Sequence, residues 1–250
     1  MLNRKVLIIF SIIILVSVTF GNSAVIGEKI EEKDDASVKE KVVLLHGYAK
    51  GSYDMITLKE ELEHLGYESI LVDLPLTFNK VEEVSEEFEK QMKEIIDTLE
   101  SEEKLHLVGH STGGLIIRYF LSNSELSEKV HRAVLIATPT QGSQLAERAD
   151  EISETFTSIF ATLESLKAEE VEKLNLEDPD HVEIGAIAGD RDYLLLGHLL
   201  DGDNDGRVRV ESVKYPGLKD FKVLPFHHDE IHQQEETARW VMQFLTKGKF

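Results

Sequence analysis

The fold is decided by one stretch of ten residues, LHLVGHSTGG at positions 105–114. Its first four residues predict a buried strand, and glycines then stand two before and two after Ser111. A sharp turn from a strand into a helix strains the residue at the turn, and side chains at Gly109 and Gly113 would collide with neighbouring strands. The stretch therefore predicts a strand, a tight turn that presents the Ser111 hydroxyl, and a helix whose N-terminal amides face that hydroxyl.

Short apolar strands alternate with amphipathic helices on both sides of this stretch. We predict strands at 42–45, 69–74, 105–108, 133–137, 182–188 and 221–224, and helices at 55–65, 84–99, 115–120, 145–174 and 238–245. Strict alternation predicts parallel pairing, right-handed crossovers and helices on both faces of one sheet. Ligands bind beyond the carboxyl ends of the strands in such sheets, so the residues that follow each strand are the functional candidates.

Composition excludes several classes of function. Asp and Glu number 47 against 27 Lys and Arg, and the formal net charge of -20 repels nucleic acid and anionic lipid headgroups. The chain has no cysteine, so a thiol nucleophile, a disulfide and a thiolate metal site are excluded. With 250 residues, 42% of them hydrophobic, we expect one catalytic domain over residues 41–250.

The N-terminal residues predict export. Arg4 and Lys5 precede an uncharged apolar run, and small and polar residues follow it. We therefore expect a signal peptide at residues 1–24, or a retained membrane tether through residues 6–26, and a secreted or extracytoplasmic protein in either case. The charged residues 25–40 predict a solvated linker.

A serine nucleophile needs a base, and the base needs an acid that orients it. Ser111 is the predicted nucleophile, with a plain helix N-cap as the alternative. Ten histidines occur, but only His227, His228 and His232 lie between the last predicted strand and the closing helix. Position favours His228 as the base, and the other two remain alternatives.

The first strand is followed by His46-Gly47-Tyr48, where a second oxyanion donor is expected. The predicted oxyanion hole consists of the backbone amides of Tyr48 and Thr112. Because backbone groups do this work, the side chains at these two positions carry little information. His46 itself is interpreted as a hydrogen-bonded turn residue.

The residues alone leave the acid open between two segments. Asp190 and Asp192 directly follow the strand predicted at 182–188, whereas Asp205 lies in a later acidic turn. Both segments follow Ser111 and precede His228, which is the order expected when the serine stands on a strand-to-helix turn of this kind.

The acidic turn also resembles part of a calcium loop. Asp201, Asp203 and Asp205 match its first ligand positions, but Ser212 stands where a bidentate glutamate is needed. The alternation of Val208 and Val210 predicts a strand rather than the helix that would leave such a loop. An exposed acidic turn is the favoured interpretation, and we expect no cofactor and no metal.

Taken together, these motifs resemble those of bacterial lipases and esterases of the α/β-hydrolase superfamily over residues 41–250. The resemblance rests on ordered segments: His46-Gly47, the turn at 109–114, Thr138-Pro139-Thr140-Gln141-Gly142-Ser143, Asn204-Asp205-Gly206, and the stretch 224–228. It implies an α/β-hydrolase fold, a mostly parallel doubly wound sheet with a small helical insertion. It also implies Asp205 as the acid and His228 as the base.

The activity implied is hydrolysis of a small-molecule or lipid ester through an acyl-enzyme on Ser111. An acyltransferase or amidase would use the same residues, and a non-catalytic envelope binding protein would keep only the fold. Phe156, Phe160 and Leu163 are candidates for the wall of an acyl pocket, with ordinary sheet-covering helices as the alternative.

Overall fold

The computed structural model describes residues 40–147, 165–193 and 197–250. The predicted export signal, almost the whole predicted linker, and Phe156, Phe160 and Leu163 lie outside these ranges. Across the part of the chain that is described, no helix combines the length and the apolar character that a membrane crossing needs. The predictions of export and of a membrane tether stay predictions.

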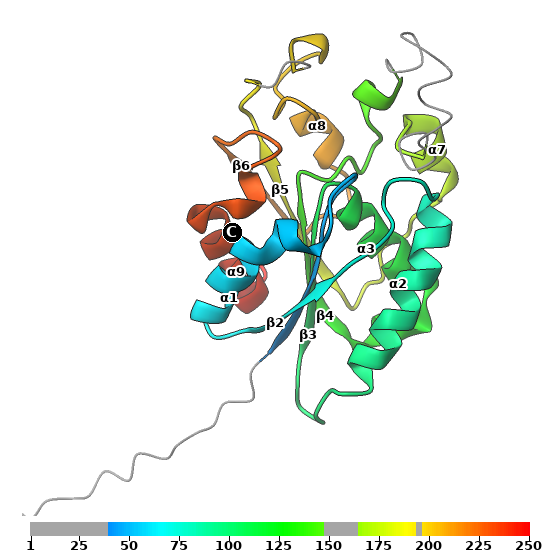
Figure 1. Ribbon diagram of the computed structural model, residues 1–250, viewed down its shortest axis with the longest axis vertical. Coiled ribbons are helices and arrows are strands. Elements are labelled where there is room, and N and C mark those ends of the chain that lie inside the picture. The colour runs from blue at the N-terminus through cyan, green and yellow to red at the C-terminus, as the bar shows by residue number, and fades with distance from the viewer. Residues whose placement is uncertain (1–39, 148–164, 194–196) are drawn as a thin grey trace, which may run out of the picture. The chain divides into compact units, whose positions relative to one another are not determined.

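One six-stranded sheet, all of it parallel, forms the centre of the domain (Figure 1). Its strands stand in the order β2-β1-β3-β4-β5-β6. Their bounds are β1 Lys41–Leu45, β2 Glu68–Val72, β3 Leu105–His110, β4 Val130–Ile136, β5 Glu183–Gly189 and β6 Asp220–Leu224. Each strand was predicted within a few residues of these bounds, because buried parallel strands are continuous apolar runs.

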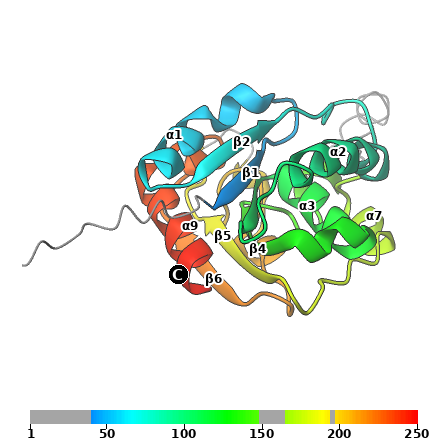
Figure 2. The same ribbon diagram turned by 90° about the horizontal axis from the view of Figure 1, so that it is seen from below.

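Helices cover both faces of the sheet, as the alternation in the sequence predicts. On one face lie α1 (Ile56–His64) and α9 (Glu235–Lys247), and on the other lie α2 (Val81–Ile96) and α3 (Thr112–Asn123) (Figure 2). The shorter helices are α7 (Ala168–Lys173), α8 (Val210–Val213), and the 3-10 turns η1 (Ser52–Met55), η2 (Glu125–Lys129), η3 (Gly197–Leu199) and η4 (Ile231–Gln233).

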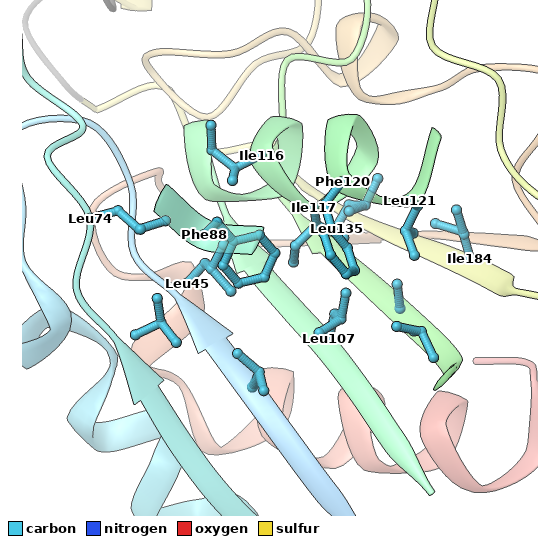
Figure 3. Close-up of a cluster of buried hydrophobic side chains, with 14 of the residues drawn as sticks. Leu45, Leu74, Phe88, Leu107, Ile116, Ile117, Phe120, Leu121, Leu135 and Ile184 are labelled. Carbon is cyan, nitrogen blue, oxygen red and sulfur yellow. The ribbon is translucent and has the colours of Figure 1, made fainter. Parts of the chain in front are cut away.

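The larger apolar core packs between the sheet and the helices α2 and α3 (Figure 3). At its centre the rings of Phe88 and Phe120 meet edge to face, with centroids 5.2 Å apart, against Leu107 and Leu135 of the sheet. This packing fixes α3, and therefore the turn that precedes it, on the central strand β3.

Two local predictions were wrong. Val210 begins the helix α8 instead of continuing a strand, and among the described residues a single antiparallel bridge, between Asn204 and Arg209, forms beside it. Alternation over so short a stretch is a weak signal, and here Val208 and Val213 are buried by tertiary packing. Leu65, expected in the buried stripe of α1, lies beyond the end of that helix and is exposed.

Candidate active site

Ser111 lies at a strained turn between β3 and α3. Its backbone has φ 53° and ψ -125°, a combination that is costly for a residue with a side chain. The flanking glycines permit the turn, because a Cβ on Gly109 would stand 2.6 Å from the nitrogen of Gly114, and one on Gly113 would stand 2.4 Å from the carbonyl oxygen of His46. The turn predicted from the sequence is therefore present.

Ser111, His228 and Asp205 lie in one hydrogen-bonded line. The Nε2 atom of His228 is 3.0 Å from the Oγ of Ser111, and its Nδ1 is 2.8 Å from the Oδ2 of Asp205. All three side chains are buried. A carboxylate only accepts, so Nδ1 of the neutral ring carries the proton and Nε2 is left to accept the hydroxyl proton of Ser111.

A tight turn holds Asp205 in place. Its Oδ1 accepts hydrogen bonds from the backbone amides of Arg207, at 3.0 Å, and of Val208, at 2.7 Å. The backbone amide of His228 in turn donates to the carbonyl oxygen of Asp205 at 2.9 Å. The loops that carry the acid and the base are therefore joined through both side chain and main chain.

The alternative acids and bases have other neighbours. No hydrogen bond or ion pair among the described residues joins His228 to Asp190 or Asp192. His227 contacts Glu230, with 3.0 Å between Nε2 and a carboxylate oxygen, and His232 contacts Asp54 at the same distance. Only His228 of the three candidate bases reaches Ser111 in the described structure.

A pocket of about 200 Å³ opens beside Ser111. Tyr48 lines it, and burial raises the pKa of its phenol. Thr112 is the first residue of α3, so its amide belongs to the turn whose N–H groups have no acceptor within the helix. Both residues of the predicted oxyanion hole therefore lie next to the nucleophile, and their role stays a prediction.

Charged side chains at this pocket escaped the sequence analysis. Lys50 and Arg207 line it, and Arg207 pairs with Asp229 at 3.0 Å. Burial raises the pKa of Asp229, but the hydrogen bond and charge of Arg207 outweigh it and the net pKa is lowered. Lys50 follows β1 and Arg207 follows Asp205, so their positions after candidate segments were the available signal.

The carboxylates of the acidic turn have partners within the protein. Asp201 exchanges hydrogen bonds with Gln144, and both oxygens of Asp205 are already engaged. Within the described ranges, the only group of acidic and histidine side chains close enough to hold a metal ion is Asp54, His110 and His232. None of these three residues was predicted from the sequence to be a metal ligand.

Solved structures share this architecture. The chain superimposes on the mature form of a lipase from Bacillus licheniformis with a TM-score of 0.72 and 20% identity, covering 84% of this chain and 92% of the lipase. A metagenomic carboxyl esterase matches with a TM-score of 0.70 and 15% identity, over 85% of this chain and 77% of that protein. At this level of identity the likeness concerns the fold.

Among the proteins similar to this chain in sequence are two from plants. Salicylic acid-binding protein 2 of Nicotiana tabacum is 31% identical over 100 residues, which are 38% of this chain and 38% of the relative. Methylesterase 9 of Arabidopsis thaliana is 33% identical over 78 residues, 29% of this chain and 30% of the relative.

The chain spans about a third of the length of the curated relatives that it matches first. The resemblance to bacterial enzymes in particular stays a prediction. The sequence model of the α/β-hydrolase fold matches residues 41–166, half of the chain and the whole of the nucleophile turn. With the six-stranded parallel sheet and the strained serine turn, this match shows that the chain belongs to the α/β-hydrolase fold family.

Proposed function

We propose that this protein hydrolyses carboxylic esters through Ser111, His228 and Asp205. Nε2 of His228 takes the hydroxyl proton as the Ser111 oxygen attacks the ester carbonyl, and the protonated ring then gives that proton to the departing alcohol. A water molecule attacks the resulting acyl-enzyme while His228 again accepts a proton, which returns to Ser111 as the acid is released. Asp205 stabilises the charged ring in both halves of the cycle.

One observation carries the proposal: the unbroken line from Asp205 to His228 to Ser111, with contacts of 2.8 Å and 3.0 Å. These are the distances that proton transfer to a general base requires. The position of Ser111 at the N-terminus of α3 adds backbone dipoles that favour an oxyanion on the attacked carbonyl. The names of the relatives and of the structural neighbours, methylesterases, lipases and an esterase, agree with this chemistry.

The pocket favours small substrates. The open pocket beside Ser111 has a volume of about 200 Å³, below the roughly 300–1,000 Å³ typical of sites for drug-sized ligands. Leu145, Leu166 and Val208 supply apolar surface there, which suits a short acyl chain. The methylesterase relatives point in the same direction, toward a small alcohol as the leaving group.

A series of p-nitrophenyl esters, from acetate to palmitate, tests the proposal on the full chain. We expect turnover of the short esters, and a loss of at least about 10⁴-fold in kcat for Ser111→Ala. A fluorophosphonate probe should label Ser111 in the native protein and leave the variant unlabelled.

Two other outcomes have distinct meanings. Acyl transfer to an added alcohol or amine in place of hydrolysis would make the protein an acyltransferase, which needs the same three residues. A folded protein that cleaves no ester and resists the probe would favour the non-catalytic binding protein.

A further inference from the structure

A second buried pair of Asp and His lies behind the candidate triad. Asp54 belongs to η1, His232 to η4, and His110 is the last residue of β3, directly before Ser111. The ring of His110 lies between two others, stacked on His232 with centroids 3.8 Å apart and tilted against His228 with centroids 4.8 Å apart. All of these side chains are buried, and the proposed mechanism uses only His228.

The contacts of His110 define its protonation. Its Nε2 lies 3.1 Å from the backbone carbonyl oxygen of His228, and since a carbonyl only accepts, Nε2 carries a proton and donates it. Complete burial, and then the nearby rings of His232 and His228, hold the pKa of His110 well below its ordinary value. The ring is therefore neutral, and its Nδ1 has no hydrogen-bond partner among the described residues.

Asp54 faces the far side of the stack. Its Oδ2 lies 3.0 Å from Nε2 of His232, and Lys50 lies 3.6 Å from its other oxygen. Burial raises the pKa of Asp54, but the contact with His232 and then the charge of Lys50 outweigh it and lower the net pKa. The Asp54 carboxylate therefore lies in contact with the edge of the His232 ring, on whose face His110 stacks.

The geometry does not suit a metal ion, although one ligand atom from each of the three residues lies within 4.8 Å of the others. Imidazole binds a metal along a lone pair in the plane of the ring, at about 2.0–2.1 Å for zinc. The rings of His110 and His232 are 3.8 Å apart and only 21° from parallel. No ion at bonding distance from both would lie near the planes of both rings.

We propose that His110, held by the Asp54–His232 pair, is a positioning residue for the base His228. The carbonyl of His228 accepts from His110, while its backbone amide donates to the carbonyl oxygen of Asp205 at 2.9 Å. Both polar groups of the His228 backbone are thereby held, and the ring that they carry keeps its Nε2 3.0 Å from Ser111. This inference rests on the proposed function, because it assigns to His228 the role of base.

The test compares His110→Met, which removes the donor, with His110→Gln, whose amide nitrogen reaches nearly as far as the Nε2 of histidine. Misplacement of a catalytic group by about 1 Å costs about 10²-fold. We therefore expect kcat per folded molecule to fall about 10–100-fold in His110→Met, with KM changed less than about twofold. His110→Gln should recover most of the loss. His106→Met serves as the control, since His106 is an equally buried histidine at the opposite end of β3.

The rate at which a fluorophosphonate labels Ser111 is measured beside kcat. His232→Gln, which keeps a donor toward Asp54 but loses the stacked ring, gives a second variant should His110→Met fail to fold. We expect it to slow labelling about 3–10-fold, the size of one weakened hydrogen bond.

Each result has a defined meaning. Variants whose kcat and labelling rate per folded molecule stay within about threefold of the native protein would overturn the positioning role and leave the proposed function intact. So would a His110→Gln variant as slow as His110→Met. If the native protein is labelled at Ser111 but cleaves no ester, the proposed function fails while the labelling rates still decide this inference; a folded native protein that is not labelled overturns both.

Discussion

The two carboxylate oxygens of Asp205 have separate tasks, and substitution by Asn or by Ala is expected to separate them. Oδ2 faces Nδ1 of His228 at 2.8 Å, and Oδ1 accepts the backbone amides of Arg207 and Val208 at 3.0 Å and 2.7 Å. An Asn side chain keeps an oxygen for the two amides but presents N–H groups to His228. An Ala side chain serves neither partner.

The expected effect on catalysis is the same for both variants. In Asp205→Asn the amide stabilises the wrong tautomer of His228, with the proton on Nε2, where it can no longer accept from Ser111. The known cost of this tautomer error in serine hydrolases is about 10⁴-fold in kcat. Asp205→Ala leaves the ring without an orienting partner, so its loss should be of similar size.

The expected effect on stability differs. A buried amide left without an acceptor costs about 1–3 kcal/mol, so the two amides make Asp205→Ala about 4 kcal/mol less stable than Asp205→Asn. For a domain of this size about 1 kcal/mol corresponds to about 2–4 °C, which predicts a Tm about 12 °C lower for the Ala variant. Asp205 is only 1% exposed, so water cannot replace its oxygen without opening the turn.

Thermal unfolding followed by circular dichroism, together with kcat on p-nitrophenyl butyrate, measures both effects. Asp192→Asn is the matched control, because Asp192 follows β5 but no hydrogen bond or ion pair among the described residues joins it to His228. This variant should keep both Tm and kcat. A Tm of Asp205→Ala within about 2 °C of the Asn variant would refute the assignment of the two oxygens. An Asp205→Asn variant that retains more than about a tenth of native kcat would refute the role of the acid.

Two further predictions concern pH and calcium. The hydrogen bond from His106, and then the Lys104 ammonium, lower the pKa of Glu40 from 4.5 to about 2 against the opposing effect of burial. A carboxyl group whose pKa is lower in the folded than in the unfolded protein stabilises the fold at pH values above its unfolded pKa, and this stabilisation is lost as the pH falls. Acidification from about pH 5 to about pH 3 should therefore destabilise the native protein more than it destabilises Glu40→Gln. Urea unfolding at both pH values measures this, and equal losses would contradict it. Because Asp201 bonds to Gln144 and both oxygens of Asp205 are engaged, millimolar calcium or a chelator should shift the Tm by less than about 1 °C; a calcium-dependent rise would restore the calcium-loop interpretation.

Much of the fold was predictable from the sequence because its signals are local. A buried parallel strand is a short apolar run, and a surface helix such as α2 repeats its apolar residues every three to four positions. The misassigned segment at Val208–Val210 has no such repeat. Its backbone is set by contacts with residues elsewhere in the chain. One example close by is the hydrogen bond from the backbone amide of Gln141 to the carbonyl oxygen of Ser212.

The residues of the candidate site differ in how well the sequence alone predicts them. Ser111 follows from the steric demands of its own turn, and position along the chain selected His228. The choice of Asp205 over Asp192 needed the family resemblance, since both lie between β5 and His228 and their order along the chain does not separate them. The interaction of His110 with the base loop was missed, because it joins residues that are 118 positions apart.

The contrast between the nucleophile turn and the base loop has a consequence for recognising distant relatives. Gly109 and Gly113 are required by close backbone approach, so the sequence near Ser111 cannot drift far. The loop that carries His228 is held through its main-chain groups, by the Asp205 carbonyl oxygen and by the His110 side chain, and these bonds leave no local sequence pattern. The family match ends at residue 166, before both Asp205 and His228. A distant homologue of this chain is therefore easiest to recognise by its serine turn, whereas the contacts in three dimensions are needed to check which residues could serve as its acid and base.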